Sequence, residues 1–202
     1  MKNVNLASER QLGFRATHLN MKERMKPEHI WHSAGLPVIL AALVLIRAGN
    51  TDMFTLFRYG LITVFGYFAA VIDLKTKRIP NNLILAMLVA WVTMMAPKLF
   101  LDTETAVRLL ASSASGFAIG GGLFLFVYFI SHKGLGGGDV KFIAVAGLYL
   151  GMSGVIPVML YGSVLAALTG LTLMLLKKIG RKDKIPLAPF LCVGIVITVF
   201  LQ

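Results

Sequence analysis

The sequence has few charged residues and a single cysteine. Only 14% of its 202 residues are charged and 57% are hydrophobic, whereas a soluble domain has about 25% charged residues. This composition excludes an ordinary soluble domain and indicates a membrane protein. The single cysteine, Cys192, excludes an internal disulfide and a zinc site built from CxxC pairs. No cofactor is expected.

Nucleic-acid binding and metal binding are not expected either. The net charge is +11, but the basic residues lie in short clusters between apolar runs, as in the positive-inside pattern of membrane proteins. The stretch EHIWH places His29 and His32 near Glu28. Because this spacing lacks a further ligand, solvated or interfacial histidines explain it better than a metal site.

Seven apolar runs predict an all-α, polytopic membrane protein. Residues 140–176 read as one helix would be roughly 55 Å long, nearly twice the hydrocarbon thickness. The sequence GMSG at 151–154 and Pro157 are therefore expected to break this stretch. A polar segment, 1–35, precedes the first run and is expected to lie in the cytoplasm or at the interface. The runs are 36–47, 58–73, 82–97, 107–131, 139–151, 155–176 and 187–202.

The linkers between the runs alternate in charge. Linkers 48–57, 98–106 and 152–154 contain Lys98 and three acidic residues, whereas the other three linkers are basic. This alternation places the N-terminus and the basic linkers in the cytoplasm and the C-terminus outside. The basic-linker residues are Lys75, Lys77, Arg78, His132, Lys133, Lys177, Lys178, Arg181, Lys182 and Lys184.

Two of the nine acidic residues adjoin apolar runs on the predicted cytoplasmic side. Asp73 ends the second run and Asp139 opens the fifth. Ionisable side chains at membrane depth are costly and indicate function. Each aspartate also has a structural explanation. Asp139 could cap its helix after the glycine-rich loop, and Asp73 could pair with Lys75 or Lys77.

Taken together, two aspartates facing one compartment favour acid–base hydrolysis of a peptide bond. One carboxylate would deprotonate water while the other, protonated, would donate to the carbonyl oxygen. Two like charges held close together cannot both ionise, so the pair would share one proton. Because the N-terminus of a helix favours negative charge, Asp139 is expected to hold more of it than Asp73.

Three motifs resemble a known family. GGGD at 136–139 resembles the GxGD signature of intramembrane aspartyl proteases. DLKTKRIPNN at 73–82 is similar to the other half of the type IV prepilin peptidase signature, and KIPLAPFL at 184–191 is similar to the segment before that family's last helix. The motifs stand in the family's order within residues 58–202.

The resemblance implies a six-helix GxGD protease core over 58–202, with an additional transmembrane helix and external linker in 36–57. It implies that Asp73 and Asp139 are catalytic, and that the enzyme cleaves basic leaders from prepilins or pseudopilins. Cleavage would occur at the cytoplasmic face of a bacterial inner membrane, and the substrate would enter through the bilayer. Gly136 and Gly138 would let the substrate peptide lie beside the carboxylates.

The chain differs from the long form of this family, and the differences limit the activity that the resemblance implies. The chain has neither paired CxxC motifs nor a glycine-rich nucleotide loop, so it looks like a short, peptidase-only form without methyltransferase activity. The main alternative is a small proton-coupled carrier that uses the same two aspartates. Gly116 and Gly120 favour close helix packing over substrate contact. The substrate, the oligomeric state and the roles of Lys75 and Lys141 are left open.

Overall fold

The computed structural model describes residues 28–47, 49, 51–131, 135–177 and 185–202, with the side chains of 28–34 excepted. The described chain divides after Val38 into two units, which are considered separately. Several predictions therefore lie outside the described residues. They concern the segment before residue 28, the side chains of Glu28, His29 and His32, and the linker residues His132, Lys133, Lys178, Arg181, Lys182 and Lys184.

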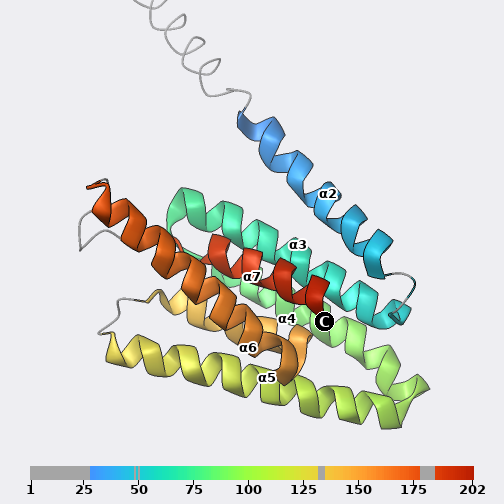
Figure 1. Cartoon of the computed structure of the whole chain (residues 1–202). Coiled ribbons are helices and arrows are strands. Elements are labelled where there is room, and N and C mark those ends of the chain that lie inside the picture. The colour runs from blue at the N-terminus through green and yellow to red at the C-terminus, as the bar shows by residue number, and fades with distance from the viewer. Residues whose placement is uncertain (1–27, 48, 50, 132–134, 178–184) are drawn as a thin grey trace, which may run out of the picture. The chain divides into compact units, whose positions relative to one another are not determined.

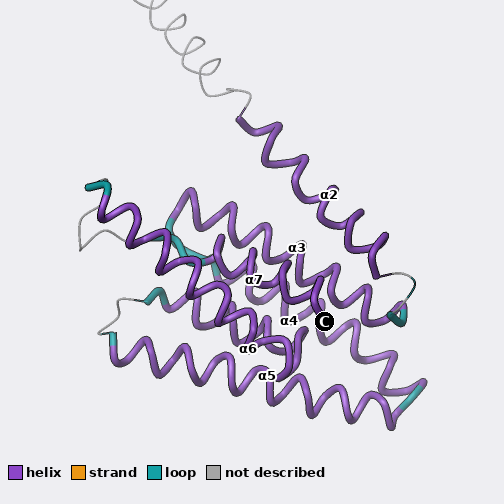
Figure 2. The backbone as a smooth tube through the Cα atoms, viewed as in Figure 1, coloured by secondary structure: helices purple, strands orange, loops and turns teal. Residues whose placement is uncertain are grey.

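Every regular element in the described part of the chain is a helix, which confirms the all-α prediction (Figures 1 and 2). Four of these helices, α3 to α6, are long and apolar enough to cross a membrane, and shorter apolar helices cover Gly35–Arg47 and Ala188–Leu201. The protein is therefore a polytopic membrane protein. The elements are α2 (Glu28–Arg47), α3 (Met53–Thr76), α4 (Asn81–Leu101), α5 (Thr103–Ile130), α6 (Gly137–Leu175) and α7 (Ala188–Leu201).

Two linkers are shorter in the structure than the linkers predicted from hydropathy, because capping aspartates let the next helix begin earlier. Asp52 accepts the Thr55 N–H at 3.1 Å, so α3 begins at Met53 and not near residue 58. Asp102 accepts the Thr105 N–H at 3.2 Å and is the single residue between α4 and α5. A capping carboxylate satisfies an unpaired N–H in the first turn, so helix can form where hydropathy falls.

The predicted break in the long apolar stretch is present at Gly151. Its φ of 69° and ψ of −176° are non-helical, and they divide α6 into two helices. The first half lies against α5, where Gly120 approaches Ile143. The second half lies against α7, where Gly194 approaches Val158. Glycine adopts this positive φ without the penalty that a side chain brings. Pro157 lies inside the second half and does not end it.

The predicted close packing at Gly116 is confirmed. A Cβ added to Gly116 would overlap the carbonyl oxygen of Gly147, and one added to Gly147 would overlap the backbone of Gly116. The two helices therefore meet backbone to backbone, as small residues allow in membrane proteins. Gly120, one turn further on, faces Val155 and Ile143. This contact fixes the helix that begins with the GGGD motif.

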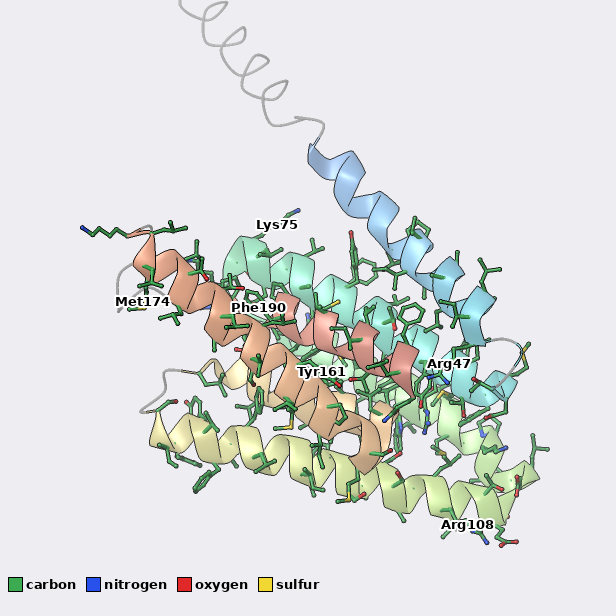
Figure 3. All side chains as sticks on the ribbon, viewed as in Figure 1. Arg47, Lys75, Arg108, Tyr161, Met174 and Phe190 are labelled. Atoms are coloured by element: carbon green, nitrogen blue, oxygen red, sulfur yellow. The ribbon has the colours of Figure 1, made fainter. Side chains whose placement is uncertain are left out.

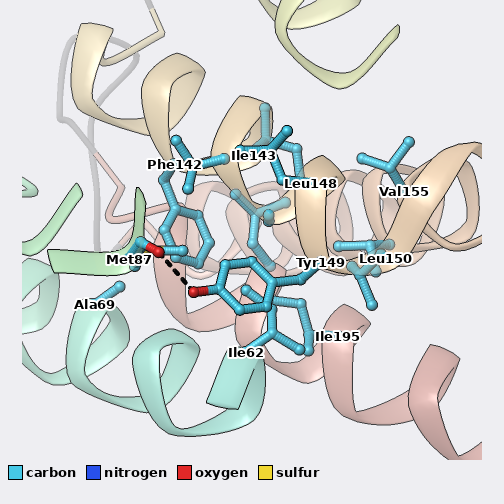
Figure 4. Packing of buried hydrophobic residues seen from close by; sticks show 14 of the residues in the cluster. Ile62, Ala69, Met87, Phe142, Ile143, Leu148, Tyr149, Leu150, Val155 and Ile195 are labelled. Atoms are coloured by element: carbon cyan, nitrogen blue, oxygen red, sulfur yellow. Dashed lines mark hydrogen bonds between the residues drawn. The ribbon is translucent and has the colours of Figure 1, made fainter. Parts of the chain in front are cut away.

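The centre of the helix bundle is occupied by Tyr149 of α6. Its side chain is fully buried, and its hydroxyl donates to the Met87 carbonyl oxygen of α4 at 2.6 Å (Figure 4). Trp91 of α4 donates from Nε1 to the Leu148 carbonyl oxygen at 3.0 Å. Both bonds join the first half of α6 to α4. Ile62 and Ile195 pack around the same tyrosine from α3 and α7.

We expect Tyr149→Phe to destabilise the protein by about 1 kcal/mol, because it removes one buried hydrogen bond and keeps the aromatic packing. Thermal unfolding in detergent would measure the loss. Tyr161→Phe, which changes a partly exposed ring on α6, is the matched control. Equal unfolding temperatures for the two variants would show that the bond to Met87 contributes nothing to stability.

Candidate active site

The first predicted aspartate, Asp73, lies in the last turn of α3 and is buried, with 4% of its surface exposed. The helix ends when Lys77 adopts the left-handed conformation, with φ of 52°, and its N–H donates to the Asp73 carbonyl oxygen at 2.7 Å. Thr76 steadies the turn by donating from Oγ1 to the Arg78 carbonyl oxygen. The turn directs Ile79 back into the core, where it is 7% exposed.

The second predicted aspartate, Asp139, lies in the first turn of α6. The alternative that Asp139 is the N-cap is wrong, because Gly136 occupies that position and the helix begins at Gly137. The Asp139 carboxyl turns back toward Gly136, and a Cβ on Gly136 would lie 2.5 Å from Asp139 Oδ2. The other oxygen, Oδ1, is buried and has no hydrogen-bond partner among the described residues. An acidic side chain in the first turn that turns back to the N-cap residue resembles a capping box, but capping does not account for the buried Oδ1.

The two aspartate motifs touch each other through Ile79 and Gly138. A Cβ on Gly138 would lie 3.2 Å from the Cβ and from the carbonyl oxygen of Ile79. This contact brings the end of α3 and the start of α6 together at one end of the bundle. Gly138 thus faces the other motif and is only half-buried.

A third segment reaches the site, and sequence reasoning missed its role. The N–H of Ala188, the first residue of α7, donates to Asp73 Oδ2 at 3.1 Å. The expectation that Asp139 holds more of the negative charge considered only each aspartate's own helix. In the structure the N-terminus of a different helix meets Asp73. The position of KIPLAPFL before the last helix was the available signal.

Among the residues that the structure describes, no basic side chain pairs with the two carboxylates of the site. The ion pairs within the described residues join Lys98 to Asp102 and Arg108 to Glu104, so the alternative that Lys75 or Lys77 pairs with Asp73 is not observed. Lys75 is exposed and points away from the helix (Figure 3).

Lys141 lies two residues beyond Asp139 and makes a polar contact with another element. It donates from Nζ to Asn81 Oδ1 at 3.0 Å, and this bond joins α6 to the first residue of α4. No three His, Cys, Asp or Glu side chains of the described chain gather in one place. The site is thus built from two carboxyl groups, backbone donors and glycines, which is an arrangement suited to acid–base chemistry.

Comparison with known proteins gives consistent matches. A prepilin leader peptidase/N-methyltransferase from Bacillus subtilis is 30% identical over 126 residues, 62% of this chain and 48% of that protein. Proteins of the same name from Xanthomonas campestris and Legionella pneumophila are 26% identical over 138 residues and 28% over 129 residues. These two alignments cover 67% and 64% of this chain, and 47% and 44% of the relatives.

The matched region therefore spans less than half the length of each relative. No solved structure matches the chain. The pattern of the type IV leader peptidase family matches residues 60–171, which contain both aspartates and the Gly116–Gly147 helix contact. Residues 60–171 are more than half of the chain, and this protein therefore belongs to the type IV leader peptidase family.

Proposed function

We propose that this protein is an intramembrane aspartic endopeptidase that removes the basic leader from type IV prepilins or pseudopilins. The observation that supports this most strongly is the contact between Ile79 and Gly138, which holds Asp73 and Asp139 at the same end of the bundle. The names of the related proteins support the same substrate class. Cleavage takes place at the cytoplasmic face of a bacterial inner membrane, and the N-terminus is cytoplasmic.

The two carboxyl groups share the chemistry of hydrolysis. The ionised carboxylate takes a proton from water as the water oxygen attacks the scissile carbonyl carbon. The protonated carboxyl donates to the carbonyl oxygen, so a neutral tetrahedral intermediate forms. The carboxyl that took the proton from water then gives it to the leaving nitrogen as the C–N bond breaks. The other carboxylate takes a proton from a hydroxyl of the intermediate, so the new C-terminal acid forms and the pair returns to its starting state. The buried Oδ1 of Asp139 has no hydrogen-bond partner in the described part of the chain. It is suited to contact the substrate, because a buried polar atom without a partner is costly.

The most direct experiment reconstitutes the protein in liposomes with a prepilin and determines the N-terminus of the product. A single new N-terminus at the end of the basic leader is the expected result. Liposomes loaded with a pH-sensitive dye would test the proton-coupled carrier in the same preparation. Proton movement without cleavage of any prepilin would favour that carrier.

We also propose that the chain does not transfer a methyl group to the new N-terminus. The relatives' names include an N-methyltransferase. This chain has a single cysteine and therefore no paired CxxC motifs. That cysteine, Cys192, is buried in α7. Incubating the cleaved pilin with the protein and labelled S-adenosylmethionine is the test. Incorporation of label at the rate of cleavage would contradict the proposal.

Gly136 and Gly138 have different roles in this proposal. Gly136 is exposed beside the Asp139 carboxyl and leaves room for a substrate backbone. Gly138 sets the spacing between the two motifs, because Ile79 occupies the space that a side chain would need. This role replaces direct substrate contact as the main reason for glycine at position 138.

We expect Gly138→Val to lower leader cleavage by about 100-fold, because a misplacement of about 1 Å at a catalytic group has this effect. Gly137→Val is the matched control, since a Cβ at Gly137 meets nothing within 4 Å. Initial rates in detergent, at equal amounts of folded protein, give the comparison. Equal rates for the two variants would show that the contact with Ile79 does not set the catalytic geometry.

A further inference from the structure

The N-terminus of α7 has one backbone donor that its own helix leaves unpaired. The N-cap residue, Leu187, offers no side-chain acceptor, and Pro189 has no N–H. The N–H groups of Phe190 and Leu191 both donate to the Leu187 carbonyl oxygen at 3.1 Å. The N–H of Ala188 is not among these donors, because it donates instead to Asp73.

Burial makes this donor important. Ala188 is fully buried, so water cannot satisfy its N–H, and an unpaired buried donor is costly. Its partner is Asp73 Oδ2, at 3.1 Å and 115 residues away in the sequence. Asp73 is itself 4% exposed. Asp73 therefore supplies an acceptor for the N–H at the end of α7, and Ala188 supplies a donor for a buried carboxylate.

The donor is held in place by packing along the whole of α7. Leu191, one turn beyond Ala188, is fully buried against Gly162 of α6. Further along, Ile195 lies against Gly66 of α3, where a Cβ on the glycine would be 3.3 Å from Ile195 Cδ1. Small residues on both neighbouring helices thus let α7 approach closely. The direction of the Ala188 N–H is fixed by these contacts.

We propose that the Ala188 N–H is a positioning element for the catalytic carboxylate of Asp73. It binds Oδ2 and so orients the carboxyl group. This inference rests on the proposed function, because it needs Asp73 to be catalytic. The KIPLAPFL segment then contributes to the reaction through a backbone N–H, that of Ala188, and not through a side chain. A bond to a charged acceptor is stronger than one between neutral groups.

Replacing the Ala188 backbone N–H by an ester oxygen tests this inference directly. Cell-free synthesis into nanodiscs with lactic acid at position 188 removes only the donor. The ester is expected to lower kcat about 10- to 100-fold and to leave KM unchanged, because it removes a hydrogen bond to a charged group without touching the substrate. The matched control is the phenylalanine hydroxy acid at position 190, which removes a bond to Leu187 in the same turn.

The outcomes separate this inference from the proposed function. Wild-type kcat for the ester at 188, or equal losses for both esters, would overturn the inference. Cleavage by Asp73→Asn would overturn the proposed function itself. Asp73→Glu provides a second measurement that does not depend on ester synthesis, because it keeps the carboxyl group but displaces it from the Ala188 N–H. Its kcat is expected to fall at least 10-fold, and wild-type kcat would again overturn the inference.

Discussion

Asp73→Asn and Asp139→Asn are each expected to lower the rate of leader cleavage by on the order of 100- to 10,000-fold, which is the usual contribution of a general acid or base. Asparagine keeps the size of the side chain, and its amide oxygen can still accept the Ala188 N–H at position 73. The fold should therefore persist while proton transfer is lost. Initial rates with a prepilin in liposomes would measure the effect.

The two substitutions are also expected to be strongly non-additive. If the aspartates act as one unit, the double variant cleaves about as fast as the slower of the two single variants. Asp102→Asn is the control, because it makes the same chemical change at the cap of α5 and keeps a good capping residue. Substantial cleavage by either single variant, or multiplied losses in the double variant, would argue against a shared dyad.

Much of the fold could be predicted because the main determinants are local. Apolar runs locate the helices, and the polar residues that interrupt them locate the turns. Gly151 was a predictable break, since a continuous helix would have been too long for the membrane. The helix ends were harder to predict. Asp52 and Asp102 lie in segments that hydropathy assigns to linkers, yet their side chains accept N–H groups that allow α3 and α5 to begin there.

The candidate site was predictable as a pair of residues but not as a three-part assembly. Scarcity of acidic residues singled out Asp73 and Asp139, because charge in an apolar chain is conspicuous. The contact of Ile79 with Gly138 and the bond from Ala188 to Asp73 depend on how separate helices pack. Hydropathy and spacing contain no information on which backbone N–H lacks a partner. The third motif marked the right segment without revealing its contact.

Gly147→Ala is expected to destabilise the protein by about 3 kcal/mol, near the upper end for an overpacked core. The added Cβ would overlap backbone atoms of Gly116 and lie 2.8 Å from the backbone nitrogen of Phe117. Backbone cannot move aside as a flexible side chain can, so α5 and the first half of α6 must separate. Thermal unfolding in detergent would measure the loss.

The position of this contact also connects stability to catalysis. The helix that contains Gly147 begins with the turn that holds Asp139, so moving it away from α5 displaces one carboxyl relative to the other. We therefore expect the folded fraction of Gly147→Ala to cleave more slowly as well. Gly122→Ala is the matched control, because it lies on α5 where a Cβ meets nothing within 4 Å. If both variants unfolded at the wild-type temperature, the helices would have to pack with more space than the structure shows.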